Sequence, residues 1–385
     1  MNKKYFIAAI FVIVVIAAGW FFYNYGNVLR LYFYLPKEAG EIVLNLTAAP
    51  GFKISIFADN LPGVRVIKED TLGNFWVSQT SAGLVSLLSM DGGVVVSHAP
   101  VFKDLNNPHG LAFSPQNSFR IYIAEEDKII SAPIYSEPDN IKVFDLPGGG
   151  NHKTRTIDFG SDGGLYASVG STCNVCREAD ERRGVILRAG EDEKEWEVFA
   201  RGLRNTVFFA WREDGKMFGT EMGRDFLGDD LPPDEINIIR EGNYGWPVCY
   251  GKNIHDGDFD KNIYFRNPCM EPFEVGSYID IPAHSAPLGL AFIPQNSGWP
   301  QDYWGDLLVA YHGSWNRSAP VGYKVVRYEF DESGEYTGRV FDFMTGFLTA
   351  AGEVLGRPVD ILVKNDGSAL ITDDYAGIVY KVTLK

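Results

Sequence analysis

The sequence predicts an all-β fold, a six-bladed β-propeller, and two observations carry this prediction. Short runs of Val, Ile, Phe and Tyr bounded by Gly, Asp, Asn and Pro recur along the chain, whereas long helical periodicity is scarce. One pattern also occurs six times: an apolar run, a short polar turn that usually holds Asp-Gly or Asn, and a second apolar run. A β-sandwich, or two smaller β domains, is the alternative fold.

The six copies of this pattern are spaced like the blades of a propeller. They begin at Val64, His109, Thr154, Val207, Leu288 and Pro358. The intervals are 45, 45, 53, 81 and 70 residues. The first intervals match a four-stranded blade, and the later ones require insertions. The stretch FKISIFAD, residues 52–59, could pair with GIVYKVTL near the C-terminus, which would close the ring and leave no long open sheet edge.

A separate N-terminal segment precedes the repeats. Residues 5–23 carry no charge and follow two lysines, and at about 1.5 Å per residue they are long enough to span a bilayer core. The lysines and the aromatic residues 20–23 favour a membrane anchor, with the body of the protein on the extracytoplasmic side. Small residues at 17–19 leave a cleaved signal peptide as the alternative. We therefore expect an anchor or signal segment (1–30), a linker (31–50) and a propeller domain (51–385).

Size and charge narrow the class of protein. The chain has 385 residues, 45% of them hydrophobic, which is enough to bury the core of one large domain or two modest ones. Its formal net charge is −15. This charge argues against a nucleic-acid partner, because the electrostatic attraction that drives such binding would become repulsion.

Polar residues precede three of the six copies. His152 precedes the third copy, Arg204 and Asn205 precede the fourth, and Arg357 precedes the sixth. In a propeller, loops at equivalent positions gather at one end of the central channel, so residues far apart in sequence converge there. Each residue alone is more often a turn residue, but their repeated placement favours a binding site.

The order of the motifs resembles that of a known family. The motifs are NHKTRTIDFGSDGGLYASVG, FARGLRNTVFFAW, GTEMGRD, PPDEINIIREGNYGWP and GRPVDILVKNDGSALITDDYAGIVYKV. Together they resemble the soluble sugar dehydrogenases that use pyrroloquinoline quinone (PQQ), especially the sorbosone dehydrogenase and aldose sugar dehydrogenase branch. The resemblance extends over residues 51–385 and implies a six-bladed propeller that oxidises a sugar.

The resemblance also implies roles for the polar residues. His152 matches the family's base, because a neutral imidazole can take a proton from a sugar hydroxyl while hydride leaves the same carbon. Arg204, Asn205 and Arg357 match residues that bind the carboxylates and carbonyl oxygens of the quinone, which suit guanidinium groups. Arg317 occupies roughly the place of another basic contact to the cofactor.

Calcium is the second cofactor that the resemblance implies. In the family one Ca²⁺ touches the quinone and polarises it, and the matching backbone ligands are Gly223 and Arg224. A second, structural Ca²⁺ maps to Glu235 and Tyr244, in keeping with the oxygen ligands that this cation prefers.

Two of the family's quinone contacts have no clear match in this sequence. One is a glutamine expected near DLNNPHGLAF, and the other is a tyrosine expected in the altered stretch VCYGKNIHDG. His109, His284 and His312 lie near blade starts and could substitute for them, although a histidine in such a place is more often structural.

Four cysteines complete the list of candidate residues. Cys173 and Cys176 form a Cys-x-x-Cys motif followed by Arg177, which lacks the histidine of a c-type haem attachment site. With Cys249 and Cys269 the count is even, and an exported protein permits disulfides. Three pairings are compatible with the sequence. A four-cysteine zinc site is the alternative, but only one pair has the required tight spacing.

The sequence therefore predicts an exported or membrane-anchored propeller that oxidises an aldose or related sugar with PQQ and Ca²⁺. Reoxidation requires an external electron acceptor, a quinone or a cytochrome, because the chain has no haem motif. A calcium-dependent sugar lactonase and a non-catalytic binding propeller are the alternative functions.

Overall fold

The computed structural model describes residues 45–135, 141–189, 196–272 and 274–385. The predicted anchor, and most of the linker, lie outside these residues. Within the described ranges, no helix is both long and apolar enough to cross a membrane. The helices described there are two short 3₁₀ turns, η1 (Thr80–Ala82) and η2 (Gln301–Tyr303).

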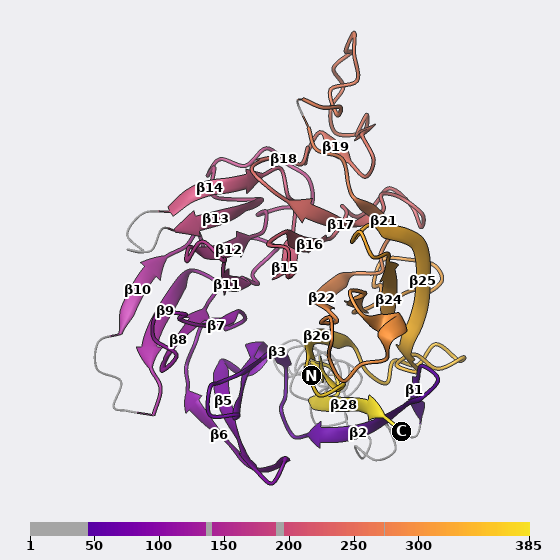
Figure 1. The fold of residues 1–385 in the computed structure, drawn as a ribbon. Helices are drawn as coiled ribbons and strands as arrows, with labels where there is room; N and C mark the ends of the chain where they lie inside the picture. Colours follow the sequence, from indigo (N-terminus) through magenta and orange to yellow (C-terminus); the bar gives the residue numbers. More distant parts are fainter. Residues whose placement is uncertain (1–44, 136–140, 190–195, 273) are drawn as a thin grey trace, which may run out of the picture. The chain divides into compact units, whose positions relative to one another are not determined.

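Six sheets are arranged around a central channel, as the repeat predicts, and they are antiparallel except where two strands of the third blade pair in parallel (Figure 1). The first blade contains β3 (Val64–Glu69), β4 (Phe75–Gln79), β5 (Leu84–Asp91) and β6 (Val94–Phe102). The second contains β7 (Leu111–Phe113), β8 (Arg120–Ala124), β9 (Lys128–Pro133) and β10 (Lys142–Asp145). The third contains β11 (Ile157–Phe159), β12 (Leu165–Val169), β13 (Val185–Ala189) and β14 (Trp196–Arg201), extended by β18 (Gly242–Asn243), which pairs parallel with β14.

The other three blades follow the same order from the channel outward. The fourth contains β15 (Thr206–Trp211), β16 (Met217–Glu221), β17 (Asp234–Ile239) and β21 (Ile279–Ile281). The fifth contains β22 (Pro287–Phe292), β23 (Leu307–Tyr311), β24 (Lys324–Phe330) and β25 (Tyr336–Thr345), extended by β1 (Thr47–Ala48). The sixth contains β26 (Pro358–Val363), β27 (Ala369–Asp373), β28 (Ile378–Leu384) and β2 (Phe52–Ala58). Strand β1 lies within the stretch that we had assigned to the linker.

The sixth blade closes the ring. Strand β2 pairs antiparallel with β28, with Phe52 opposite Leu384 and Lys53 opposite Thr383. The predicted partnership of residues 52–59 with the C-terminal strand is therefore confirmed. Closure joins the N-terminal strand β2 and the C-terminal strand β28 in one sheet, with β2 as its outermost strand.

Burial across each blade explains the apolar runs in the sequence. The second strands β4, β12, β16, β23 and β27 are buried at every residue. The outermost strand β6, in contrast, is largely exposed. Large side chains such as Trp76, Phe218 and Tyr328 fill the space between neighbouring blades. A strand covered by a blade on each side must be apolar on both of its faces, so its sequence does not alternate.

Both cysteine pairs form disulfides. Cys173 is bonded to Cys176 in the loop between β12 and β13, and Cys249 is bonded to Cys269. The structure thus selects one of the three pairings that the sequence left open. The four-cysteine zinc site is wrong, because the sulfur of each cysteine is in an S–S bond. The second disulfide braces the long insertion between β17 and β21. This insertion contains the hairpin β19 (Cys249–Tyr250) and β20 (Ile254–His255), and it projects from the ring (Figure 1).

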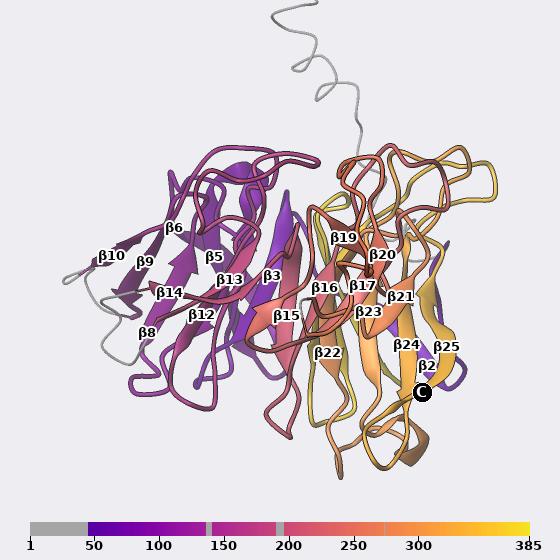
Figure 2. The same ribbon diagram turned by 90° about the horizontal axis from the view of Figure 1, so that it is seen from above.

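The strands run between two ends that carry all the loops (Figure 2). The first strand of every blade starts at the same end of the channel. We call this end the mouth. It comprises the loops that precede β3, β7, β11, β15, β22 and β26, and the loops between the second and third strands of each blade. The opposite end, which we call the far end, comprises the turns that follow these inner strands.

Candidate active site

His152 lies at the mouth, in the loop that precedes β11. Its Nδ1 lies 3.0 Å from the carbonyl oxygen of Ser171 and 2.9 Å from the Ser171 hydroxyl. That hydroxyl donates to the carbonyl of Cys173 over 2.7 Å, so it acts as an acceptor toward the imidazole. This network assigns the proton to Nδ1. The lone pair of His152 is then on Nε2.

The surroundings keep His152 neutral. Burial is the main cause that lowers the pKa of His152 to about 3, and the positive charge of Arg204 lowers it further. An imidazole must be unprotonated to accept a proton, so this environment favours the role of a base at neutral pH.

Arg204 is held rigidly beside the histidine. It is 6% exposed, and its Nε and Nη2 donate to the backbone and side-chain oxygens of Asn174 over 2.8 and 2.9 Å. Nη1 donates to the carbonyl of Met222, and Nη2 also lies 3.4 Å from Asp225. Four of its five N–H bonds are thus engaged, which orients the guanidinium and leaves one donor for another group.

Asn205 approaches His152 across a glycine. A Cβ atom on Gly170 would lie 2.6 Å from Cβ of His152 and 2.8 Å from Oδ1 of Asn205. A side chain at Gly170 would therefore collide with both. The backbone N–H of Asn205 donates to Glu221, and this contact anchors the start of β15. The structure thus brings His152, Arg204 and Asn205 into one cluster.

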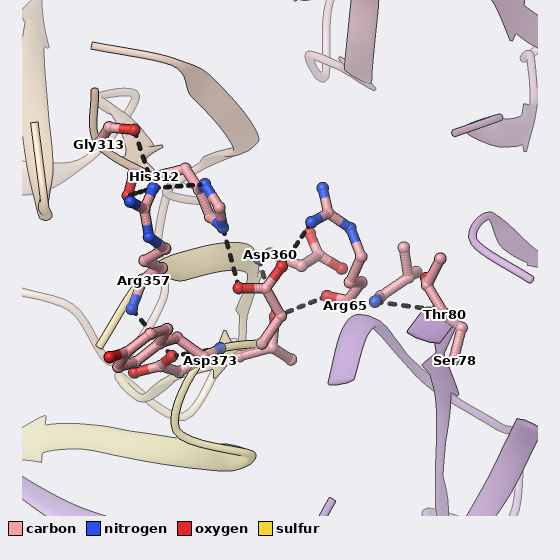
Figure 3. A network of polar contacts seen from close by, with 12 residues as sticks. Arg65, Ser78, Thr80, His312, Gly313, Arg357, Asp360 and Asp373 are labelled. Atoms are coloured by element: carbon pink, nitrogen blue, oxygen red, sulfur yellow. Dashed lines mark hydrogen bonds and ion pairs between the residues drawn. The ribbon is translucent and has the colours of Figure 1, made fainter. Parts of the chain in front are cut away.

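Arg357 belongs to a second cluster at the mouth (Figure 3). Its guanidinium donates to the carbonyl of Gly313 over 3.0 Å and to the hydroxyl of Tyr323 over 2.9 Å. Beside it, His312 Nε2 lies 2.9 Å from Asp374 Oδ1, and Arg65 binds the other oxygen of Asp374 over 2.6 Å. The result is a carboxylate flanked by one histidine and one arginine, next to a further arginine.

Sequence reasoning missed Arg65 and Asp374. Arg65 lies one residue into the first copy of the repeat, and Asp374 follows β27. The signal that could have found them is the one used for Arg204, namely a charged residue at the boundary of an apolar strand. Nε of Arg65 and Nε2 of His109 are both buried with no hydrogen-bond partner. These two atoms are suited to a ligand that supplies acceptor or donor groups.

The other two histidines singled out from the sequence have different surroundings. His109 is fully buried under the mouth, where its Nδ1 lies 3.2 Å from the carbonyl of Arg155. Burial lowers the pKa of His109 well below its usual value. His284 Nε2 instead lies 2.8 Å from the carbonyl of Gly228, which makes it a support for that loop.

The four residues assigned to calcium line one small cavity of about 30 Å³, which Arg204 also borders. Glu235 is buried there, and burial together with Asp280 and Asp234 raises the pKa of Glu235 to about 7. The side chains of Arg224 and Tyr244 already have partners, Asp256 at 2.6 Å and the carbonyl of Ile238 at 2.7 Å. The N–H of Gly223 donates to Asp234.

The donors around this cavity are oxygen atoms. Glu221 and Asp256 border it along with Glu235, and burial raises the pKa of Glu221 to about 8. Asp256 is paired with Arg224, but Glu221 and Glu235 have no ion-pair partner among the described residues, and such buried carboxylates suit a hard cation such as Ca²⁺. The residues present are therefore compatible with calcium.

Arg317 is not part of either cluster. It lies in the loop between β23 and β24, where its guanidinium binds the carbonyl of Asp229 and, over 2.9 Å, the carboxylate of Asp230. Asp230 is largely exposed, so this ion pair is at the rim of the mouth. Here Arg317 connects two loops.

A much larger cavity is elsewhere, in the far half of the channel. It measures about 510 Å³ and is lined by the inner strands and by turns of the far end. Both cations that line it are paired, Lys68 with Asp158 over 3.0 Å and Arg212 with Asp214 over 2.6 Å, and its lining contains no histidine. Size alone therefore does not identify the active site, because the groups that can move a proton are at the mouth.

Comparison with known sequences places the chain among related proteins. A family model described as TrAA12-like matches residues 46–384. An uncharacterized protein of Borreliella burgdorferi is 33% identical over 365 residues, which covers 89% of this chain and 92% of that protein. A pyrroloquinoline quinone-dependent pyranose dehydrogenase of Coprinopsis cinerea is 26% identical over 87% of this chain, and the alignment spans 54% of that relative.

Solved structures share the propeller fold. The holo form of the PQQ domain of the Coprinopsis cinerea pyranose dehydrogenase has a TM-score of 0.71 at 23% identity, over 88% of this chain and 97% of that one. The calcium structure of the Trichoderma reesei enzyme of family AA12 has a TM-score of 0.74 at 20% identity, with the same coverage of both chains. The PQQ-bound aldose sugar dehydrogenase of Streptomyces coelicolor has a TM-score of 0.62 at 17% identity, over 88% and 100% of the two chains.

Proposed function

Since this chain belongs to the TrAA12-like family of PQQ-dependent sugar oxidoreductases, we propose that it oxidises an aldose or a related sugar of the sorbosone or glucose type. The observation that carries this proposal is the neutral His152, whose Nε2 is free to accept a proton beside Arg204 and Asn205. A calcium-dependent sugar lactonase and a non-catalytic binding propeller are the alternative functions, and the experiments below test them against this proposal.

His152 would remove the proton of the C1 hydroxyl of the sugar. As Nε2 takes that proton, the C1–H bond breaks and its electron pair leaves with the hydrogen as hydride, so the cyclic sugar becomes a lactone. Bound PQQ supplies the two-electron acceptor for this hydride. The Nδ1–H of His152, held by Ser171, keeps the ring in the orientation and tautomer that this transfer needs.

Four residues of the two mouth clusters would hold the cofactor. Arg204, Asn205 and Arg357 offer N–H donors to its carboxylates and carbonyl oxygens, and Arg65 has a buried Nε–H without a partner. These donors are fixed by other protein contacts, so little ordering is required when a ligand binds.

Calcium would bind at the oxygen-lined cavity next to Arg204. The resemblance implies two ions: the backbone oxygens of Gly223 and Arg224 would hold the Ca²⁺ that touches the quinone, and the carboxylate of Glu235 with the backbone oxygen of Tyr244 would hold a structural Ca²⁺. We propose that a cation bound here neutralises the buried acids and strengthens the loop that carries Asp225.

The first experiment tests His152. Dye-linked oxidation of a panel of aldoses is measured for the full chain and for His152→Gln, each with added PQQ and Ca²⁺. We expect the variant to lose activity by about 10²–10⁴-fold because the base is absent, while it still takes up PQQ. His98→Gln, on the exposed outer strand β6, is the matched control and should retain activity. Equal activity of wild type and His152→Gln contradicts the proposal, and a wild type that hydrolyses lactones without PQQ supports the lactonase.

A second experiment tests calcium by its effect on stability. Ca²⁺ added to the chelator-treated wild type should raise Tm, and Glu235→Gln should abolish most of that rise because a ligand charge is lost. Asp331→Asn, an exposed acid in the far-end turn after β24, is the control and should preserve the rise. An unchanged wild-type Tm would exclude calcium at this cavity.

We also propose that residues 1–30 hold the enzyme at the extracytoplasmic face of the membrane, near a quinone or cytochrome that reoxidises the cofactor. The uncharged stretch 5–23 supports this location. Release of the activity from membranes by high salt alone, without detergent, would contradict the anchor.

A further inference from the structure

Two large aromatic side chains at the mouth are exposed to solvent. Phe226, in the loop between β16 and β17, is 70% exposed, and Trp315, in the loop between β23 and β24, is 72% exposed. Their rings are in edge-to-face contact, with centroids 6.2 Å apart and planes at 89°. Exposed aromatic rings that meet each other make a local apolar surface, and such surfaces mark binding sites.

The loop that carries Phe226 is held by its neighbours. On its N-terminal side, the N–H of Asp225 donates to Asn174 Oδ1 over 2.8 Å, and Asn316 lies 3.5 Å from the carboxylate of Asp225. Beyond Phe226, the carbonyl of Gly228 is bound by His284 over 2.8 Å.

The loop that carries Trp315 is attached to the same segment. The N–H of Ser318 donates to Asp229 over 3.1 Å, and Arg317 binds Asp230 over 2.9 Å. Contacts with two other loops of the mouth, and contacts between the two aromatic loops themselves, therefore fix the aromatic pair. A ligand that binds to fixed rings loses less free energy to ordering the protein.

The aromatic pair lies outward of the proposed catalytic cluster. Asp225, which immediately precedes Phe226, contacts Arg204, and Arg204 is only 6% exposed. Asp225 thus connects the buried guanidinium of Arg204 to the two loops that carry the exposed rings, since Asn316 also contacts Asp225. A group bound against these rings is farther out than the sugar unit that faces His152.

The chemistry of the reaction indicates which part of a sugar substrate can lie against these two rings. The C1 carbon of the oxidised sugar must face Nε2 of His152, so its O4 and O6 point away from the base. In an oligosaccharide with a free reducing end, the next unit is attached through these oxygens. The faces of a pyranose ring carry C–H groups, which pack against aromatic rings as other apolar surfaces do.

We propose that Phe226 and Trp315 form a subsite for the second sugar unit of an oligosaccharide whose reducing end is oxidised. This inference rests on the proposed function and extends it from monosaccharides to linked sugars. The subsite would explain why two large apolar side chains remain exposed to water at a place where loops of the third, fourth and fifth blades hold them.

The kinetic test compares a disaccharide with its monosaccharide. The full chain with PQQ and Ca²⁺ is assayed with cellobiose, maltose and glucose. We expect Trp315→Ala to lower the ratio of kcat/KM for disaccharide over glucose by about tenfold, mainly through KM, whereas Trp315→Phe keeps most of the ratio. Phe119→Ala is the matched control, because Phe119 is a half-exposed aromatic residue in the turn between β7 and β8 at the far end. A ratio that Trp315→Ala and Phe226→Ala leave unchanged for both disaccharides overturns the proposal.

A binding test separates this inference from the proposed function. Calorimetric titration uses methyl β-cellobioside and methyl β-glucoside, which are blocked at C1 and are not oxidised. The wild type should bind the cellobioside about tenfold more tightly than the glucoside, and Trp315→Ala should remove this difference. If no sugar is oxidised but the difference persists, the subsite stands and the proposed function fails. If sugars are oxidised but neither binding nor kinetics distinguishes the two sugar lengths, the subsite is wrong.

Discussion

At the mouth of the channel Arg204 is buried beside a neutral histidine, whereas at the far end Arg212 lies over the rings of three phenylalanines and is bound by Asp214. The guanidinium of Arg212 is 5.0 Å from the Phe218 centroid, with Phe292 and Phe330 also within 6 Å of it. Both arginines are well packed. Arg204 lowers the pKa of the buried His152, whereas Arg212 lowers the pKa of Asp214, the exposed acid that pairs with it.

The comparison indicates that the two ends of the channel have different roles, the far end in stability and the mouth in chemistry. The far end has the larger cavity, where Lys68 is neutralised by Asp158 and Arg212 by Asp214. The mouth holds a histidine without charge, a buried arginine and buried acids with raised pKa values. Perturbed groups that gather at one place indicate a functional site. The three predictions below test whether the two ends differ in this way.

The largest effect is expected from Arg204→Gln. Loss of the guanidinium frees Asn174 and Asp225 and removes a donor to the cofactor, so kcat/KM should fall by about 100-fold. Because the charge of Arg204 lowers the pKa of His152, its removal raises that pKa. The base works unprotonated, so the acid limb of the pH profile should move to higher pH. An acid limb that stays in place would show that Arg204 does not act on His152.

The two disulfides should separate activity from stability. Cys249 and Cys269 are 20 residues apart, and Cys249→Ser/Cys269→Ser should cost about 3 kcal/mol of unfolding free energy with little change in kcat. Cys173 and Cys176 are 3 residues apart, so their removal should cost about 2 kcal/mol or less.

The shorter disulfide should nevertheless have the larger effect on activity. Asn174 lies between its two cysteines and binds Arg204, so Cys173→Ser/Cys176→Ser should lower kcat/KM by about tenfold. Denaturant unfolding and steady-state kinetics of the two double variants check this. Equal losses of kcat/KM in the two double variants would contradict this prediction.

The smallest effect on activity is expected from Arg212→Gln at the far end. The variant loses the contact with three aromatic rings and the pair with Asp214, so unfolding free energy should fall by about 1–2 kcal/mol. We expect kcat/KM within about twofold of wild type, and an acid limb at the same pH. A shifted acid limb here would mean that the two ends are coupled.

Much of the fold could be predicted from the sequence. The six repeat starts coincide, within three residues, with the inner strands β3, β7, β11, β15, β22 and β26. The pairing of β2 with β28 was also predictable, because both stretches are apolar and lacked a partner within their own repeat. Position at a blade start was enough to nominate His152, Arg204, Asn205 and Arg357, and the structure brings the first three together. Their catalytic and binding roles remain predictions.

Contacts across the ring were not predictable in this way. Arg65 and Asp374 are 309 residues apart and meet only because the first and sixth blades are neighbours. Phe226 and Trp315 come from different blades, and nothing local in either loop indicates that their rings touch. The position of Arg317 at the rim likewise depends on where the loop with Asp229 and Asp230 lies.

The sequence by itself determined the strands, their sixfold repetition and the closure of the ring, because an apolar run between turn residues is a local signal repeated at a blade-sized interval. Only the tertiary structure decided which cysteines pair, which oxygen atoms surround the small cavity, and which side chains share the mouth with His152. The contacts at the mouth join loops of different blades, whose separations are set by the packing of six sheets around one axis. Each disulfide instead lies within a single connection, and the fold of that connection decides which cysteines meet.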